Sequence, residues 1–221
     1  MCFSPQGDLV AGVAVSAIGV DACLHLRGRR EFAAVAALPL LFGLHQIDES
    51  FVWWGLRGDV PHQLSSVAMW IYLIFALVVL PVLAPLLVLG IERTRRERRR
   101  IVPFVVLGAV VSAILLEAML VGHPRASLGS YHIAYSIGLQ HGIAVIGLYV
   151  VATCGPLLLS GSRSIMWFGV ANLVAVVVLA RLCADGFTSL WCLYAALVSA
   201  AIALHLRRTA ARSSEPAMST A

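Results

Sequence analysis

The chain has 221 residues, of which 60% are hydrophobic and only 12% are charged, with a formal net charge of +5. So few charges cannot solvate a water-soluble surface of this size, and the composition therefore argues against a soluble globular protein and indicates a polytopic membrane protein. The positive charge does not indicate a nucleic-acid partner, because the arginines lie between apolar runs and not on a basic face interleaved with aromatic residues.

Seven apolar runs follow one another along the chain, and a helix needs about 20 residues to cross the hydrocarbon core of a membrane. We expect an all-α bundle of seven transmembrane helices at residues 8–26, 33–56, 65–91, 101–121, 133–160, 165–184 and 187–206. Residues 1–206 would form one transmembrane domain. Residues 207–221 lack apolar content and are expected to be a disordered cytoplasmic tail. The first run has no basic segment before it and no small-residue cleavage site between it and its flanking arginines, so we expect a retained span and not a signal peptide.

The placement of arginine predicts the orientation. All 16 basic residues are arginines, and thirteen of them lie in alternate connections or the tail, namely Arg27, Arg29, Arg30, Arg93, Arg95, Arg96, Arg98, Arg99, Arg100, Arg163, Arg207, Arg208 and Arg212. The other side has only Arg57, Arg125 and Arg181. The positive-inside rule then predicts the N-terminus outside and the C-terminus inside, in the plasma (inner) membrane of a bacterium, with the lipid bilayer as main partner. The absence of lysine excludes a retinal Schiff base.

The five cysteines show no metal-binding spacing. Three of them, Cys2, Cys183 and Cys192, are predicted toward the oxidising outer face. The sequence leaves open whether they pair.

Polar residues inside the apolar runs indicate a buried site. A charged side chain at the centre of a bilayer costs at least ~2.5 kcal/mol, so such residues normally face the bundle interior. In the stretch LFGLHQIDESFVWWGL, residues 41–56, His45 and Glu49 are four residues apart and share a helical face, with Gln46 beside them. We therefore predict a polar pocket in the outer half of the bundle, centred on Glu49. The predicted topology also brings Glu117, His141, Arg181 and Asp185 into the outer half of the bundle. Arg181 and Asp185 would form an ion pair.

Four sequence blocks resemble a bacterial family of seven-helix membrane proteins of unknown function whose members begin Met-Cys-Phe-Ser. The blocks are MCFSPQGDLVAGVAVSAIGV, ALPLLFGLHQIDESFVWWGL, YVVATCGPLLLSG and FTSLWCLYAALVSAAIALHLR. The family pattern has a Gln-Gln pair, then Glu-Gly three residues later, then Trp. Gln46 and Glu49 match it, whereas His45 and Ser50 replace the first Gln and the Gly. The resemblance implies a fold but no reaction.

Several functions fit this pattern, and the sequence leaves open whether the protein is an enzyme. The favoured prediction is small-ligand binding, sensing or partner assembly at the pocket. One alternative is proton-coupled transport or a proton relay through Glu49 and Glu117. Another is a zinc-dependent intramembrane hydrolase with His45, Glu49 and His141 as ligands. A haem protein with axial histidines His45 and His141 is a further alternative.

Overall fold

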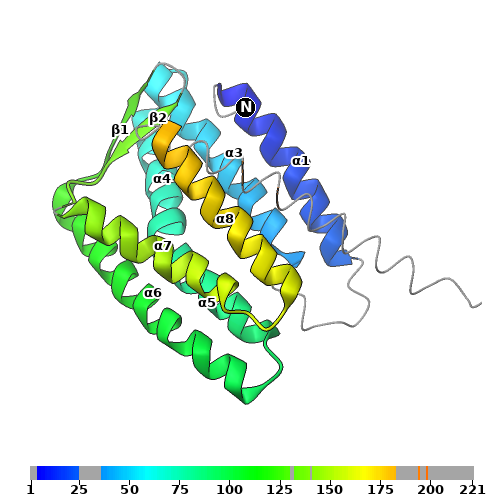
Figure 1. The fold of residues 1–221 in the computed structure, drawn as a ribbon. Coiled ribbons are helices and arrows are strands. Elements are labelled where there is room, and N and C mark those ends of the chain that lie inside the picture. Colours follow the sequence, from blue (N-terminus) through cyan, green and yellow to red (C-terminus); the bar gives the residue numbers. More distant parts are fainter. Residues whose placement is uncertain are drawn as a thin grey trace, which may run out of the picture.

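The structure is a computed structural model and is mostly helical (Figure 1). It describes residues 4–24, 36–129, 132–139 and 141–182, together with Tyr194 and Val198. The described elements are α1 (Pro5–Leu24), α3 (Leu38–Arg57), α4 (His62–Leu73), η2 (Ile74–Val79), α5 (Leu80–Ile91), α6 (Arg95–Gly122), β1 (Arg125–Leu128), β2 (Ile133–Ser136), α7 (Gly142–Leu158) and α8 (Arg163–Leu182). Because α4, η2 and α5 follow one another without a break, the described residues form six continuous helices.

Most of the predicted helices are present. The helices α1, α3, α4 to α5, α6 and α8 lie on the first, second, third, fourth and sixth apolar runs. The seventh run, 187–206, lies outside the described residues except for Tyr194 and Val198, which are helical. The predicted tail at 207–221 also lies outside them, as do Asp185, Cys2, Cys183 and Cys192.

The fifth run differs from the prediction. Residues 133–136 form strand β2, which pairs antiparallel with β1 so that Arg125 lies opposite Ser136. Helix α7 begins only at Gly142, after Gly138 and His141 adopt left-handed backbone conformations with φ of 65° and 56°. The prediction of a helix from residue 133 was therefore wrong, because a short apolar run does not distinguish a half-buried strand from the first turn of a helix.

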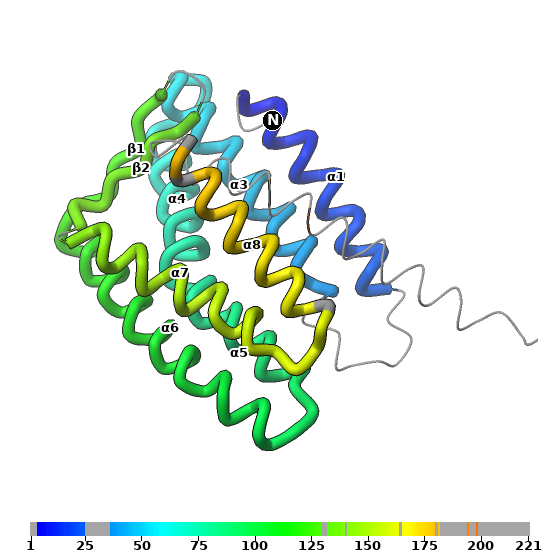
Figure 2. The backbone as a smooth tube through the Cα atoms, viewed as in Figure 1, coloured from blue at the N-terminus to red at the C-terminus, as the bar shows by residue number. Residues whose placement is uncertain are grey.

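Neighbouring helices pack in an order close to their order in the chain. Helix α1 packs on α3 and α3 on α4, while α5, α6 and α7 pack on one another and α7 packs on α8. Figure 2 shows α1 and α6 on opposite sides of the bundle. The β1–β2 hairpin lies near the end of α3 and contacts it. Ile133 of the hairpin is fully buried against Val52, Trp53 and Ala68.

Small residues allow the helices to approach closely. Gly12 and Gly19 of α1 face Ile47 and Leu40 of α3, and a side chain on either glycine would collide with the partner helix. Gly43 of α3 meets Ser16 of α1 in the same way. The spacing of Gly12, Ser16 and Gly19 places all three on one face, the pattern by which helices pack in membranes.

The long helix from residue 62 to 91 contains a π-helical segment stabilised by its neighbours. Within η2, the Leu80 amide donates to the Phe75 carbonyl, five residues earlier. The next residue, Pro81, has no N–H to donate to Ala76. The Tyr149 hydroxyl of α7 donates to the Ala76 carbonyl at 2.7 Å instead. Side chains of neighbouring helices thus compensate for the interrupted backbone hydrogen bonding of this helix.

The outer surface of the bundle is apolar. Large hydrophobic side chains are exposed on every described helix, among them Val10, Val67, Val106, Ile143 and Trp167, which is 63% exposed. Among the residues that the structure describes, three helices are long and apolar enough to cross a membrane, at Pro5–Leu24, His62–Ile91 and Arg95–Gly122. Two more apolar helices, Gly142–Leu158 and Ile165–Leu179, are shorter.

Candidate ligand-binding site

Helix α3 carries a polar face that the bundle encloses. His45, Gln46 and Glu49 are 7%, 1% and 0% exposed. They are enclosed because α3 packs between α1 and α4. Ser50 is also fully buried, and its hydroxyl donates to the Gln46 carbonyl at 3.3 Å. The structure thus turns His45, Gln46 and Glu49 inward, as the helical spacing predicts, while Asp48 is half-buried at the side of this face.

Aromatic rings connect this face to the hairpin. The His45 imidazole stacks on the Tyr72 ring of α4 with centroids 4.1 Å apart and an interplanar angle of 13°. Tyr72 in turn stacks on Tyr135 of β2, at 4.8 Å and 16°. Phe75 lies 4.7 Å from His45 on a second side. The hairpin that replaces the start of the predicted fifth helix therefore contributes a ring to the column that ends at His45.

Asp8 of α1 is a further buried acid, and it was not among the site residues predicted from the sequence. Its side chain is fully buried. Helices α1 and α3 run antiparallel, and Gly12 of α1 lies against Gly43 and Ile47 of α3. Asp8 is one turn closer than Gly12 to the N-terminus of α1, so it lies level with the turn of α3 that follows Ile47. Asp8, Gln46 and Glu49 each interact with a neighbouring group. The signal in the sequence was the helical spacing of Asp8 from Gly12, Ser16 and Gly19, which assigns it to the tightly packed face.

The other predicted site residues do not share this burial. Glu117 is exposed, because the buried positions of α6, including Leu115 and Met119, lie on a different face of that helix. His141 is exposed at the N-cap of α7. Arg181 is exposed near the end of α8, and its predicted ion-pair partner Asp185 lies outside the described residues. The expectation that Glu117 and His141 point into the same buried pocket as Glu49 was therefore wrong.

The predicted zinc ligands are not gathered into one site. Within residues 4–24, 36–129, 132–139 and 141–182, no three His, Cys, Asp or Glu side chains are grouped so that they could hold a metal ion. His45 and Glu49 share the buried face of α3, but His141 is an exposed residue that follows the hairpin. Cys23 and Cys154 are free thiols.

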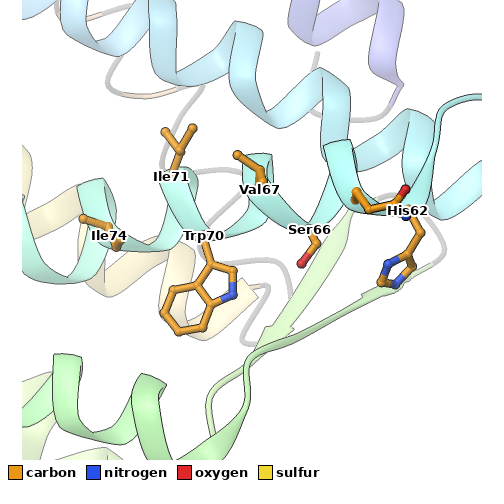
Figure 3. Close-up of a pocket in the computed structure, with 7 residues that line it drawn as sticks. His62, Ser66, Val67, Trp70, Ile71 and Ile74 are labelled. Atoms are coloured by element: carbon orange, nitrogen blue, oxygen red, sulfur yellow. The ribbon is translucent and has the colours of Figure 1, made fainter.

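A shallow groove of about 470 Å³ lies on a different surface. It is lined by residues of α4 and its continuation at spacings of three and four, namely His62, Gln63, Ser66, Val67, Trp70, Ile71 and Ile74. Figure 3 shows these side chains projecting from a single helix. None of the polar residues of α3 lines this groove, so it is separate from the buried face described above.

Comparisons with known proteins give a family but no activity. A search of curated proteins found no match, and a search of solved structures found none. A family model described as a family of unknown function, DUF6629, matches residues 1–218. Any function must therefore be argued from the site itself. Because the match covers nearly the whole sequence, the chain belongs to the DUF6629 family of unknown function.

Proposed function

We propose that the protein is a multi-pass membrane protein that binds a small cationic ligand inside its helix bundle, at a polar cluster formed by Asp8, His45, Gln46 and Glu49. The observation that carries this proposal is the complete burial of two acids, Asp8 and Glu49, in a bundle whose exterior is apolar. Ionisable side chains inside a membrane are costly, so they usually mark a ligand or ion site.

The apolar exterior supports the membrane setting. Exposed valine, leucine and isoleucine side chains cover helices that are long enough to span the hydrocarbon core. Lipid would cover this surface, whereas water would leave an apolar surface much larger than soluble proteins tolerate. We propose seven spans with the N-terminus outside and the arginine-rich end at Arg93–Arg100 inside a bacterial plasma membrane, following the positive-inside rule.

The chemistry of the polar cluster favours a ligand with positive charge. Ionised carboxylates only accept hydrogen bonds, and the Gln46 side chain can add an amide oxygen as an acceptor. The Phe75 ring packs on His45, which shares the buried face of α3 with Gln46 and Glu49. Aromatic faces attract cations, including organic ammonium groups. The donor set therefore suits a small organic cation better than an anion.

Ligand-dependent stability tests the proposal. The purified full-length protein would be heated in detergent with tetramethylammonium chloride and, for comparison, with sodium or potassium chloride at the same concentration. A bound ion at one hundred times its dissociation constant adds about 2.7 kcal/mol of stability, which raises the midpoint of a chain this size by roughly 5–10 °C. We expect such a saturable rise for tetramethylammonium, and its loss in Glu49→Gln and Asp8→Asn, which remove charge with little change of volume.

Glu117→Gln is the matched control, because it removes an acid that is exposed on α6. This variant should keep the full rise in midpoint. A rise of equal size in Glu49→Gln, or a rise with tetramethylammonium no larger than with sodium or potassium, would refute binding of an organic cation at this cluster.

A proton relay is the second candidate, and the position of Asp48 favours it. Asp48 is half-buried beside the fully buried Glu49, so the two acids span the distance from the interior toward the helix surface. Neighbouring acids of this kind can pass protons. In liposomes with an imposed pH gradient, the relay predicts proton flux that Asp48→Asn and Glu49→Gln each reduce and that Glu117→Gln leaves unchanged. Equal flux in all three variants and in protein-free liposomes would exclude it.

A further inference from the structure

The two turns at one end of the bundle carry a dense group of arginines. We define the arginine end as Arg93, Arg95, Arg96, Arg98, Arg99, Arg100 and Arg163. All seven are exposed. Figure 1 shows that the α5–α6 and α7–α8 turns, which contain them, lie at the same end of the molecule. The structure therefore gathers on one surface the charges that the sequence places in two separate connections.

Most of these arginines are held on a regular helix. The Thr94 hydroxyl accepts a hydrogen bond from the Glu97 amide at 3.2 Å, and the Glu97 carboxylate accepts one from the Thr94 amide at 3.0 Å. This reciprocal capping box fixes the first turn of α6. Residues 95–100 are consequently a rigid extension of a membrane-spanning helix and not a loose connection.

The two acids of this segment point toward the neighbouring turn. The buried Glu92 carboxylate accepts hydrogen bonds from the Ser160 hydroxyl at 2.5 Å and from the Gly161 amide at 3.1 Å. The Glu97 carboxylate lies over Gly161, where a side chain would collide with it. At about 100° per residue, the arginines at 95, 96, 98, 99 and 100 then cover an arc of roughly 200° on the other side of α6. The positive charge faces outward, and the negative charge faces the protein.

The length of α6 sets the depth of the arginines. The helix has 28 residues, and the first six contain its arginines. The remaining 22 residues, at 1.5 Å per residue, span about 33 Å, close to the ~30 Å thickness of the hydrocarbon core. When this apolar part crosses the core, the arginine-bearing turns extend about 9 Å into the layer of lipid headgroups.

We propose that the arginine end binds the phosphate groups of anionic phospholipids in the leaflet that it faces. This inference rests on the membrane setting proposed above and is independent of the cation site. Guanidinium groups bind phosphate through paired hydrogen bonds, and each basic residue near an anionic surface contributes about 1 kcal/mol, equivalent to a roughly fivefold change in affinity. Because these arginines lie on a capped helix, several of them can contact the same lipid layer without an entropic cost for ordering the backbone.

The test compares two lipids around the reconstituted full-length protein. Electron spin resonance of spin-labelled phosphatidylglycerol and phosphatidylcholine would give the relative association constant of the two. We expect the wild-type protein to favour phosphatidylglycerol at least fivefold at low salt, and less at high salt. Changing Arg95, Arg96, Arg98 and Arg99 together to Gln should remove most of the preference. The control is Arg57→Gln with Arg125→Gln and Arg181→Gln, which removes charge at other exposed positions and should keep the preference.

Every outcome bears on the proposal. Equal association of the two lipids with the wild-type protein would overturn it, as would an unchanged preference in the quadruple variant or binding of an RNA oligonucleotide in place of lipid. If the quadruple variant does not fold, Arg98→Gln with Arg99→Gln should still reduce the preference several-fold. Ion-dependent stability is measured in detergent without phosphatidylglycerol, so failure of the cation site and failure of lipid binding are distinguished.

Discussion

The bond from Tyr149 to the π-helical segment makes a quantitative prediction about the fold that carries the site. The change is Tyr149→Phe, which removes one hydroxyl and keeps the ring. That hydroxyl donates to the Ala76 carbonyl at 2.7 Å, where Pro81 supplies no backbone N–H. The variant therefore leaves a carbonyl inside the bundle without the donor that compensates for the proline.

The expected loss follows from the hydrogen bond and its surroundings. Interhelical hydrogen bonds in membranes contribute about 0.6 kcal/mol on average and up to ~1.7 kcal/mol, and a carbonyl left without a partner adds to the cost. We expect Tyr149→Phe to lower the free energy of unfolding by about 1–1.5 kcal/mol. In a Pro81→Ala background, the new amide can bond to Ala76, so the same change should cost less than about 0.5 kcal/mol.

Unfolding of the purified protein by sodium dodecyl sulfate in mixed micelles would measure both values. Ser112→Ala is the control, because it removes a similar bond: the Ser112 hydroxyl donates to the Val78 carbonyl at 2.6 Å. The residue five positions after Val78 is not a proline, so Pro81 does not remove the π-helical donor of that carbonyl. Its cost should be the same in the wild-type and Pro81→Ala backgrounds. If Tyr149→Phe also costs the same in both backgrounds, the proposed compensation for the proline is refuted.

Two further predictions concern packing around the polar cluster. Gly43→Val should destabilise the protein by more than ~2 kcal/mol, because the valine side chain would collide with Ser16. Gly90→Ala, at a glycine with open space around it, should be neutral or mildly stabilising in the same unfolding assay. Ile133→Ala should cost about 2–4 kcal/mol and speed hydrogen exchange of the hairpin more than that of α6, because Ile133 anchors the hairpin in the core. Unchanged exchange of the hairpin would refute this role of Ile133.

The sequence predicted the helices better than it predicted the site. Long apolar runs leave little choice in a membrane, where every backbone group must be paired within a helix or a closed barrel. The helical spacing also predicted correctly that His45 and Glu49 face inward. It did not place Glu117 and His141, because an acid near a helix end can face either side of its helix, and only the packing of α6 and the hairpin decides which.

Composition and the spacing of polar residues were sufficient to determine the apolar helices, the gathering of arginine in alternate connections and the polar face of α3, since these depend on residues close together in the chain. The tertiary structure alone decided that Tyr135 reaches Tyr72 from a hairpin and that the Glu92 carboxylate accepts hydrogen bonds from the α7–α8 turn. These features depend on which elements are neighbours and in what register, and residues close together in the chain do not encode contacts between segments far apart in the sequence.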